Sequence, residues 1–205
     1  MAASPGYDVS QKRLRAKDRR AQILNVAAAL FDTDGYHSTS LEQIAGEVGV
    51  AKASLYYYFK SKEDLLVALH QEMMVLLLDS LAARMEDGRL NREEVLRGIM
   101  HDILGLMESH PGRLKIFFEA YRELPESVRA EISRQRRDYR QSLAKLIEQG
   151  IAAGEFRERD PELTSLAVLG MCNWSYQWFR VDGARPAGEI ADNFHELIMA
   201  GLRPR

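Results

Sequence analysis

The segment that follows Gly49 carries side chains whose types and spacing suit binding to a nucleic acid. Within two helical turns it places one lysine, one alanine, one serine and three tyrosines: Lys52, Ala53, Ser54, Tyr56, Tyr57 and Tyr58. Lysine and serine can donate hydrogen bonds to base edges in a major groove, and a small alanine lets the backbone approach. Tyrosine hydroxyls can donate to phosphate oxygens, which position a protein on a duplex. We therefore predict Lys52 as a guanine contact and Tyr56 and Tyr58 as phosphate contacts.

Two flanking sites extend this predicted surface. The hydroxyls of Thr39 and Ser40 stand at the start of a predicted helix, where backbone N–H groups favour a phosphate. Lys62 adds a positive charge at the start of a later helix. The alternative for the three tyrosines is packing in a core or an interface. A short helix cannot bury all three, so we favour a nucleic-acid contact for Tyr56 above Tyr57 and Tyr58.

The elements around these residues form a helix-turn-helix pattern. Ser40, with Glu42 and Gln43 behind it, has the spacing of a helix N-cap. The helix that follows has an apolar face and ends at Gly49; its face is Leu41, Ile44, Ala45 and Val48. A short helix over 51–57 comes next, with Leu55 and Phe59 expected inside. In such a pair the second helix enters the major groove.

The string from Leu41 to Leu65 resembles the signature of the TetR family of transcriptional regulators. The resemblance covers about residues 17–66, and Ala51 departs from it because a capping serine is common there. It implies an all-α fold with a three-helix DNA-binding domain and a C-terminal domain for ligand binding and dimerisation. It also implies a homodimer, double-stranded operator DNA as partner, and a small-molecule effector.

Local signals along the rest of the chain agree with an all-α fold of about nine helices. We expect helices over 17–34, 41–48, 51–57, 62–86, 91–108, 112–123, 126–153, 161–181 and 187–202. Glycines, Asn91, and the Asp160–Pro161 pair supply most of the stops and starts. We divide the chain into a flexible basic arm (1–16), a DNA-binding domain (17–62) and a ligand-binding and dimerisation domain (63–205).

The resemblance also assigns residues in the C-terminal part. The side chains expected at the effector are Met73, Met107, Phe117, Phe118, Tyr121, Trp174, Gln177 and Trp178. Those expected at a dimer seam are Leu166, Leu169, Gly170, Phe194, Leu197 and Ile198. Each of them could equally be plain core. Arg113, Arg122 and Arg180 are candidates for the phosphates of a ligand.

Composition and charge exclude several other classes of protein. The formal net charge is −2, but residues 1–62 hold nine Lys or Arg and six Asp or Glu, so 9 − 6 = +3 falls at the predicted DNA-binding end. A single cysteine, Cys172, excludes an internal disulfide framework, and we expect a cytoplasmic protein without a membrane span. The five histidines lack metal-binding spacing, no catalytic motif is found, and we expect neither an enzyme nor a cofactor.

The resemblance to the TetR family implies a ligand-responsive transcriptional repressor, released from a palindromic operator by a small apolar effector. The run from Asn173 to Arg180 looks like acyl-CoA-responsive members of the family, which favours a fatty acyl-CoA and control of lipid catabolism. The alternative is a regulator of an efflux pump that responds to drug-like hydrophobic compounds. A helical scaffold without DNA activity is disfavoured by Lys52, Tyr56 and Lys62.

Overall fold

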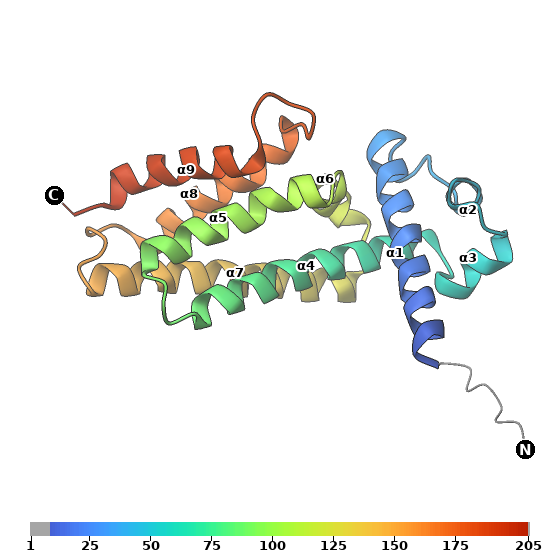
Figure 1. The fold of residues 1–205 in the computed structure, drawn as a ribbon, viewed down its shortest axis with the longest axis horizontal. Coiled ribbons are helices and arrows are strands. Elements are labelled where there is room, and N and C mark those ends of the chain that lie inside the picture. Colours follow the sequence, from blue (N-terminus) through green and yellow to red (C-terminus); the bar gives the residue numbers. More distant parts are fainter. Residues whose placement is uncertain (1–8, 205) are drawn as a thin grey trace, which may run out of the picture. The chain divides into compact units, whose positions relative to one another are not determined.

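The computed structural model describes residues 9–204, and all of the regular structure in this range is helical (Figure 1). The α-helices are α1 (Val9–Thr33), α2 (Leu41–Val48), α3 (Lys52–Tyr58), α4 (Lys62–Glu86), α5 (Arg92–Ser109), α6 (Arg113–Glu119), α7 (Glu126–Ala152), α8 (Pro161–Trp174) and α9 (Ala187–Leu202). Two short 3₁₀ segments, η1 (Ala120–Glu123) and η2 (Ser175–Gln177), follow α6 and α8. The predicted fold class is confirmed.

Helix α1 begins at Val9, whereas the sequence predicted its start near Lys17. Residues 9–16 lack apolar periodicity, so the period-based prediction missed them. They contain no proline or glycine, and glutamine, leucine, lysine and arginine all favour a helix. The C-terminal half of the predicted flexible arm is therefore helical, and residues 1–8 lie outside the described residues.

The predicted local signals set most of the helix boundaries. Ser40 Oγ accepts a hydrogen bond from the Gln43 N–H (3.2 Å), and Gln43 Oε1 accepts one from the Ser40 N–H (2.7 Å). Asn91 and Glu94 form the same reciprocal cap at the start of α5. Gly49 takes a left-handed φ of 73° after α2, a conformation that a residue without a β-carbon adopts at little cost. Ala51 caps α3 without a side-chain bond, as expected.

The chain divides into two compact units, with the boundary inside α4 between Ala68 and Leu69. In the first unit α1 packs against α2, and α2 packs against α3. Apolar side chains from all three helices form its core; they include Ile23, Leu24, Ala27, Ile44, Val48 and Leu55. This core fixes which side of α3 remains exposed.

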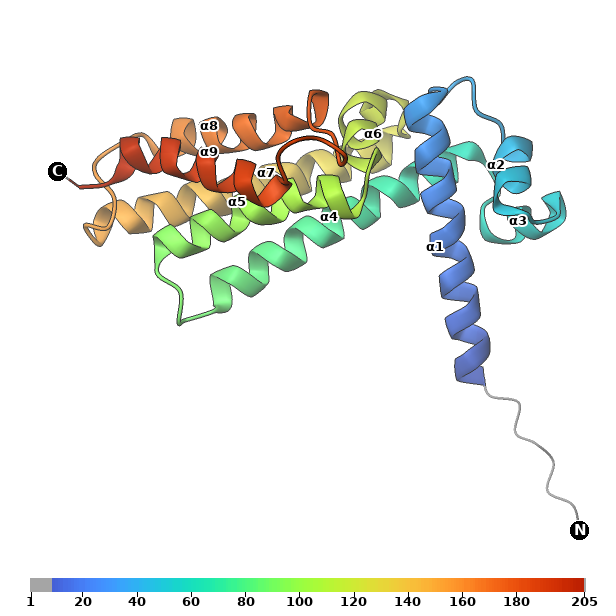
Figure 2. The same ribbon diagram turned by 45° about the horizontal axis from the view of Figure 1, so that its top comes forward.

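The second unit is a helical bundle in which α5 packs along α9 and α7 packs along α8 (Figure 2). The largest buried side chains of α5 are Leu96, Ile99, Met100 and Ile103. The close approach of α7 and the segment that follows it depends on Gly150, because a β-carbon there would meet the ring of Phe156. The packing therefore brings α4, α5, α6, α7 and α8 around the site described below.

Helix α8 ends at Trp174, well before the predicted end near Val181. Ser175 Oγ donates to the Met171 carbonyl (3.1 Å), and the chain continues as 3₁₀ with Trp178 N–H donating to the Ser175 carbonyl (3.1 Å). Serine competes with regular helical bonding in this way, and the aromatic residues that follow are weak helix formers. The prediction of one continuous helix over 161–181 is therefore wrong beyond Trp174.

Among the helices of residues 9–204, α4 is long and apolar enough to cross a membrane. The sequence had predicted no membrane span. Its residues Leu65, Leu66 and Met73 are fully buried within the protein. The core helix of a folded protein meets the same criterion, so this finding alone gives little support for a span. The absence of a membrane partner stays a prediction.

Candidate functional site

The exposed side of α3 carries the residues predicted to read bases. Leu55 and Phe59 are buried, as expected, and hold the helix against its unit. Lys52, Ala53 and Ser54 are exposed, and Tyr57 has 77% of its surface exposed. An exposed large aromatic beside a lysine and a serine is a surface suited to a groove.

Lys52 is paired within its own unit. Its Nζ forms an ion pair with Glu42 on α2 and lies 5.7 Å from the centroid of the Tyr56 ring. The hydrogen bond to Glu42 raises the pKa of Lys52 and lowers that of Glu42. Both side chains are more than half exposed, so the pair is weak and open to exchange for another acceptor. Glu42 therefore lies directly beside the predicted base contact.

Thr39 is not available to a phosphate, contrary to the prediction. It is 2% exposed, and its hydroxyl donates to the carbonyls of Gly35 (2.9 Å) and Leu30 (3.3 Å). The bonds tie the loop after α1 back to that helix. Ser40 is half-buried; its oxygen accepts the cap bond from Gln43, and its hydroxyl donates to the Glu42 carboxylate, which helps to lower the pKa of Glu42.

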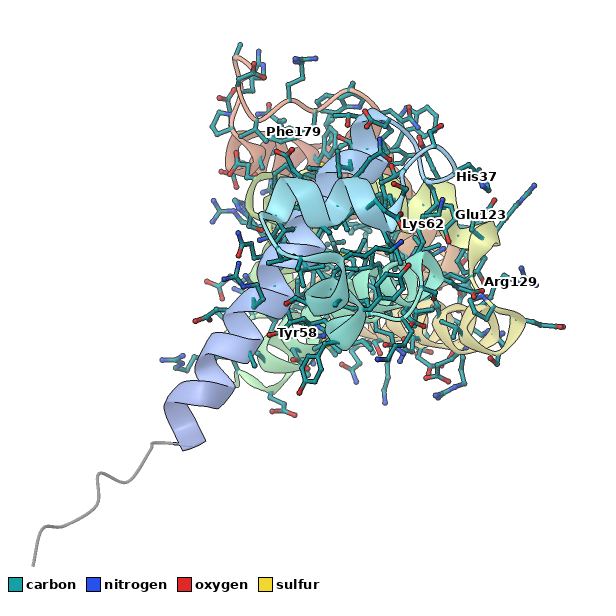
Figure 3. All side chains as sticks on the ribbon, turned by 90° about the vertical axis from the view of Figure 1, so that its right-hand side faces the viewer. His37, Tyr58, Lys62, Glu123, Arg129 and Phe179 are labelled. Atoms are coloured by element: carbon teal, nitrogen blue, oxygen red, sulfur yellow. The ribbon has the colours of Figure 1, made fainter. Side chains whose placement is uncertain are left out.

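Lys62 has a structural role, and its predicted phosphate contact stays a prediction. Its three ammonium donors go to the backbone carbonyls of Tyr36 (2.7 Å), Thr39 (3.0 Å) and His37 (3.1 Å). Figure 3 shows Lys62 near His37. The Nζ also lies 4.6 Å from the centroid of the Tyr36 ring. The first residue of α4 therefore holds the loop between α1 and α2.

The other tyrosines of α3 differ in exposure. Tyr58 is half-buried and its ring meets that of Tyr57 edge to face, at 5.3 Å between centroids. Tyr56 is half-buried, and its carbonyl accepts a bond from Lys60 Nζ (2.8 Å). The structure thus brings Lys52, Ser54, Tyr56, Tyr57 and Tyr58 together on one short helix.

The second unit contains a cavity of about 310 Å³ with a mainly apolar wall. Its lining comes from α4 to α8: Met74, Leu77, Ile103, Leu114, Phe117, Phe118, Arg136, Tyr139, Arg140, Leu166, Leu169, Gly170 and Asn173. A volume near 300 Å³ is at the low end for small-molecule pockets. The cavity is therefore the candidate effector site.

Of the predicted effector residues, Phe117 and Phe118 line this cavity. Met73 and Met107 are buried but lie outside its wall. Tyr121 donates to the Arg129 carbonyl (2.9 Å), and Gln177 donates to Glu119 (3.4 Å).

Trp174 and Trp178 are exposed, with 64% and 49% of their surface accessible, and do not line the cavity. Membership of a cavity depends on the rotation of each helix about its axis, which aromatic content alone does not reveal.

Helix α7 supplies the polar part of the wall, which no signal in the sequence predicted. Arg136 Nη2 donates to the Phe117 carbonyl (2.6 Å), and its guanidinium carbon lies 4.0 Å from the Phe117 ring centroid and 4.6 Å from that of Tyr121. Burial lowers the pKa of Arg136 to about 10. Arg113, by contrast, pairs with Glu72 (3.0 Å) and does not line the cavity.

Two family models match the two units of this chain. A model of bacterial regulatory proteins of the tetR family matches residues 23–69, and one of the tetracyclin repressor-like C-terminal domain matches residues 89–202. The second match spans more than half of the chain. The chain belongs to the TetR family. Its members are DNA-binding regulators, so the protein is a transcriptional regulator and not an enzyme.

Individual TetR relatives agree with this assignment. The HTH-type transcriptional repressor KstR2 of Mycobacterium tuberculosis is 26% identical over 193 residues, or 92% of this chain and 94% of that protein. The TetR family regulator PfmR of Thermus thermophilus has a TM-score of 0.82 at 32% identity, over 89% of this chain and 99% of that one. AibR, solved with isovaleryl coenzyme A and operator DNA, has a TM-score of 0.76 at 30% identity, over 91% and 100%.

TetR regulators form dimers, and the predicted seam residues of this chain lie partly at the surface of α8 and α9. Leu197 and Leu166 have 66% and 46% of their surface exposed, and Phe194 is half-buried with its ring 6.4 Å from that of Trp178. Leu169 and Ile198 are half-buried and Gly170 is exposed. Leu166, Leu169 and Gly170 also line the cavity, although the sequence predicted other residues at the effector.

Proposed function

We propose that this TetR-family repressor acts as a cytoplasmic homodimer on a palindromic operator and is released by a fatty acyl-CoA that signals lipid catabolism. The observation that carries the proposal is the cavity of about 310 Å³ in the unit that does not contain the helix-turn-helix. A separate ligand cavity and a DNA-reading helix in one chain are what a ligand-responsive repressor needs.

On the DNA side, Lys52 and Ser54 of α3 are the proposed base contacts, with Ala53 allowing close approach. Tyr56, Tyr57 and Tyr58 are proposed to donate to phosphates or to pack on sugars at the groove edges. Ser40 stands at the start of α2, where backbone N–H groups favour an anion, so it is proposed to contact the DNA backbone. The base that each side chain reads would be set by the operator.

On the ligand side, the cavity wall supports an acyl group. Leu77, Ile103 and Leu114 offer an apolar surface, and Phe117 and Phe118 add aromatic faces. The volume is small, so most of the coenzyme A part of such a ligand would remain outside while the acyl part enters. The solved complex of AibR with isovaleryl coenzyme A and operator DNA supports the same class of effector.

Helix α4 provides the route by which the effector would alter DNA binding. Met74 and Leu77 of this helix line the cavity, and Lys62 at its first residue binds the loop between α1 and α2. A continuous helix transmits a displacement along its length because its backbone bonds resist bending. We propose that filling the cavity displaces α4 and changes the separation of the two α3 helices in the dimer.

The experiment begins with selection of genomic fragments by the purified protein, which supplies an operator. A mobility shift of that operator is then measured with increasing decanoyl-CoA. We expect release of the DNA, and we expect genes of fatty-acid breakdown beside the bound fragments. Efflux-pump genes, or release by drug-like cations but not by decanoyl-CoA, would contradict the acyl-CoA assignment.

A cavity-filling variant makes the test specific. Leu169→Trp places an indole in the cavity wall, so the protein should bind the operator and resist release by decanoyl-CoA. Lys145→Trp places the same side chain on the exposed side of α7 and should behave as the wild type. Equal release of both variants would show that the effector binds elsewhere.

A further inference from the structure

Four buried polar atoms on one stretch of α7 have no hydrogen-bond partner among the described residues. They are Gln135 Oε1, Arg136 Nε, Tyr139 Oη and Arg140 Nε. Buried polar groups in folded proteins are almost always hydrogen-bonded, because leaving them unpaired is costly. Three of the four residues, Arg136, Tyr139 and Arg140, line the cavity. The unpaired groups therefore surround the candidate ligand site.

Arg136 is a largely buried cation that pairs with no carboxylate among the described residues. The rings of Phe117, Tyr121 and Phe118 surround it, with centroids 4.0, 4.6 and 5.5 Å from the guanidinium carbon. Aromatic faces stabilise a cation but do not neutralise it. Desolvation lowers the pKa of Arg136, which shows that burial of this charge is only partly compensated.

Tyr139 presents a second donor in the same wall. It is 5% exposed, and its hydroxyl has no partner among the described residues. Tyr139 lies three residues after Arg136 on α7, but its hydroxyl lies toward Asp102, Cys172 and Arg84, and burial raises its pKa. Arg140 contributes less, since its Nε lies 3.4 Å from Glu162 Oε2.

We infer that the effector is an amphipathic anion whose oxygen group binds Arg136, with its apolar body against Phe117, Phe118 and Leu169. This inference rests on the proposed function of the cavity and adds the polar half of the ligand. A purely apolar ligand would leave Arg136 Nε unpaired and the cation without a counter-ion. The anionic group is the carboxylate of a free fatty acid or a phosphate of a coenzyme A ester.

Binding of three probes to the full chain tests the inference. Isothermal titration with decanoate, decanoyl-CoA and 1-decanol varies the charge while keeping the same ten-carbon chain. At least one anionic probe should bind at least tenfold more tightly than 1-decanol. Equal affinity for all three, or no binding of any of them, would overturn the inference.

Variants on α7 assign the effect to named groups. Arg136→Gln should remove the preference for the anionic probe, and Tyr139→Phe, which keeps the ring and loses a hydroxyl that lies toward Asp102, should keep it. Arg137→Gln is the matched control, because Arg137 is the exposed neighbour on the same helix and should change nothing. Loss of decanoate binding alone identifies a carboxylate, and loss of decanoyl-CoA binding alone identifies a phosphate. An unchanged preference in Arg136→Gln would refute the site.

The anion site and the proposed ligand-induced release can each fail while the other holds. A protein that binds an anion through Arg136 but keeps its operator bound would contradict ligand-induced release and leave this site intact. Release of DNA by decanoyl-CoA that is unchanged in Arg136→Gln would support ligand-induced release and contradict this site. Operator binding without ligand should be the same for all three variants, which checks that each has folded.

Discussion

At the scale of single residues, Lys62 shows how a family position can have a role other than DNA contact. Three backbone carbonyls accept its ammonium protons, so Lys62→Ala leaves them without a donor. We expect the free energy of unfolding of the chain to fall by about 2 kcal/mol. Urea denaturation measures this, with Lys60→Ala, which loses a bond to one carbonyl, as the milder control. Equal midpoints for the two variants would contradict this role.

Lys52 and Glu42 form a second residue-scale test, because a weak ion pair holds the proposed base contact. Lys52→Ala should reduce discrimination at one base pair of the operator by on the order of tenfold. Glu42→Gln should tighten binding to operator and random DNA alike, since it removes a competing acceptor and a negative charge. Competition binding on single-base variants of the operator measures both effects. A uniform loss across all sequences in Lys52→Ala would assign this lysine to a phosphate.

At the scale of helices, two glycines with opposite surroundings give a matched pair of substitutions. Gly150→Ala on α7 would drive a methyl group into the Phe156 ring, and should destabilise the fold by about 1–3 kcal/mol. Gly105→Ala on α5 has no heavy atom within 4 Å of the new carbon, and should stabilise the fold by up to about 1 kcal/mol. Thermal unfolding compares the two. Equal changes would mean that the packing of α7 on the segment after it is loose.

The same scale shows which features the sequence could predict. The caps at Ser40 and Asn91 and the stop at Gly49 depend on neighbours within a few residues, so sequence spacing was sufficient. The placement of Trp174 and Trp178 depends on the end of α8 and on helix rotation, which tertiary packing decides. Arg136 carries no local signal at all. Its role follows only from the rings that α6 and η1 bring around it.

At the scale of the whole molecule, the exposed apolar side chains of α8 and α9 are the proposed dimer surface. Leu197→Glu places a charge at a position with 66% exposure, so the monomer should stay folded while the dimer dissociates. Sedimentation velocity and circular dichroism measure these two properties separately. Operator affinity should fall with dimerisation, because each protomer supplies one recognition helix. An unchanged dimer would place the seam elsewhere.

The coupling between cavity and DNA is the central claim at this scale, and thermodynamic linkage tests it most directly. The affinity of the protein for decanoyl-CoA is measured with and without saturating operator DNA. A coupling of about 1–3 kcal/mol predicts that operator weakens decanoyl-CoA binding by roughly 5- to 150-fold, and that the ligand weakens operator binding by the same factor. Identical affinity for decanoyl-CoA in the presence and absence of operator would contradict the account.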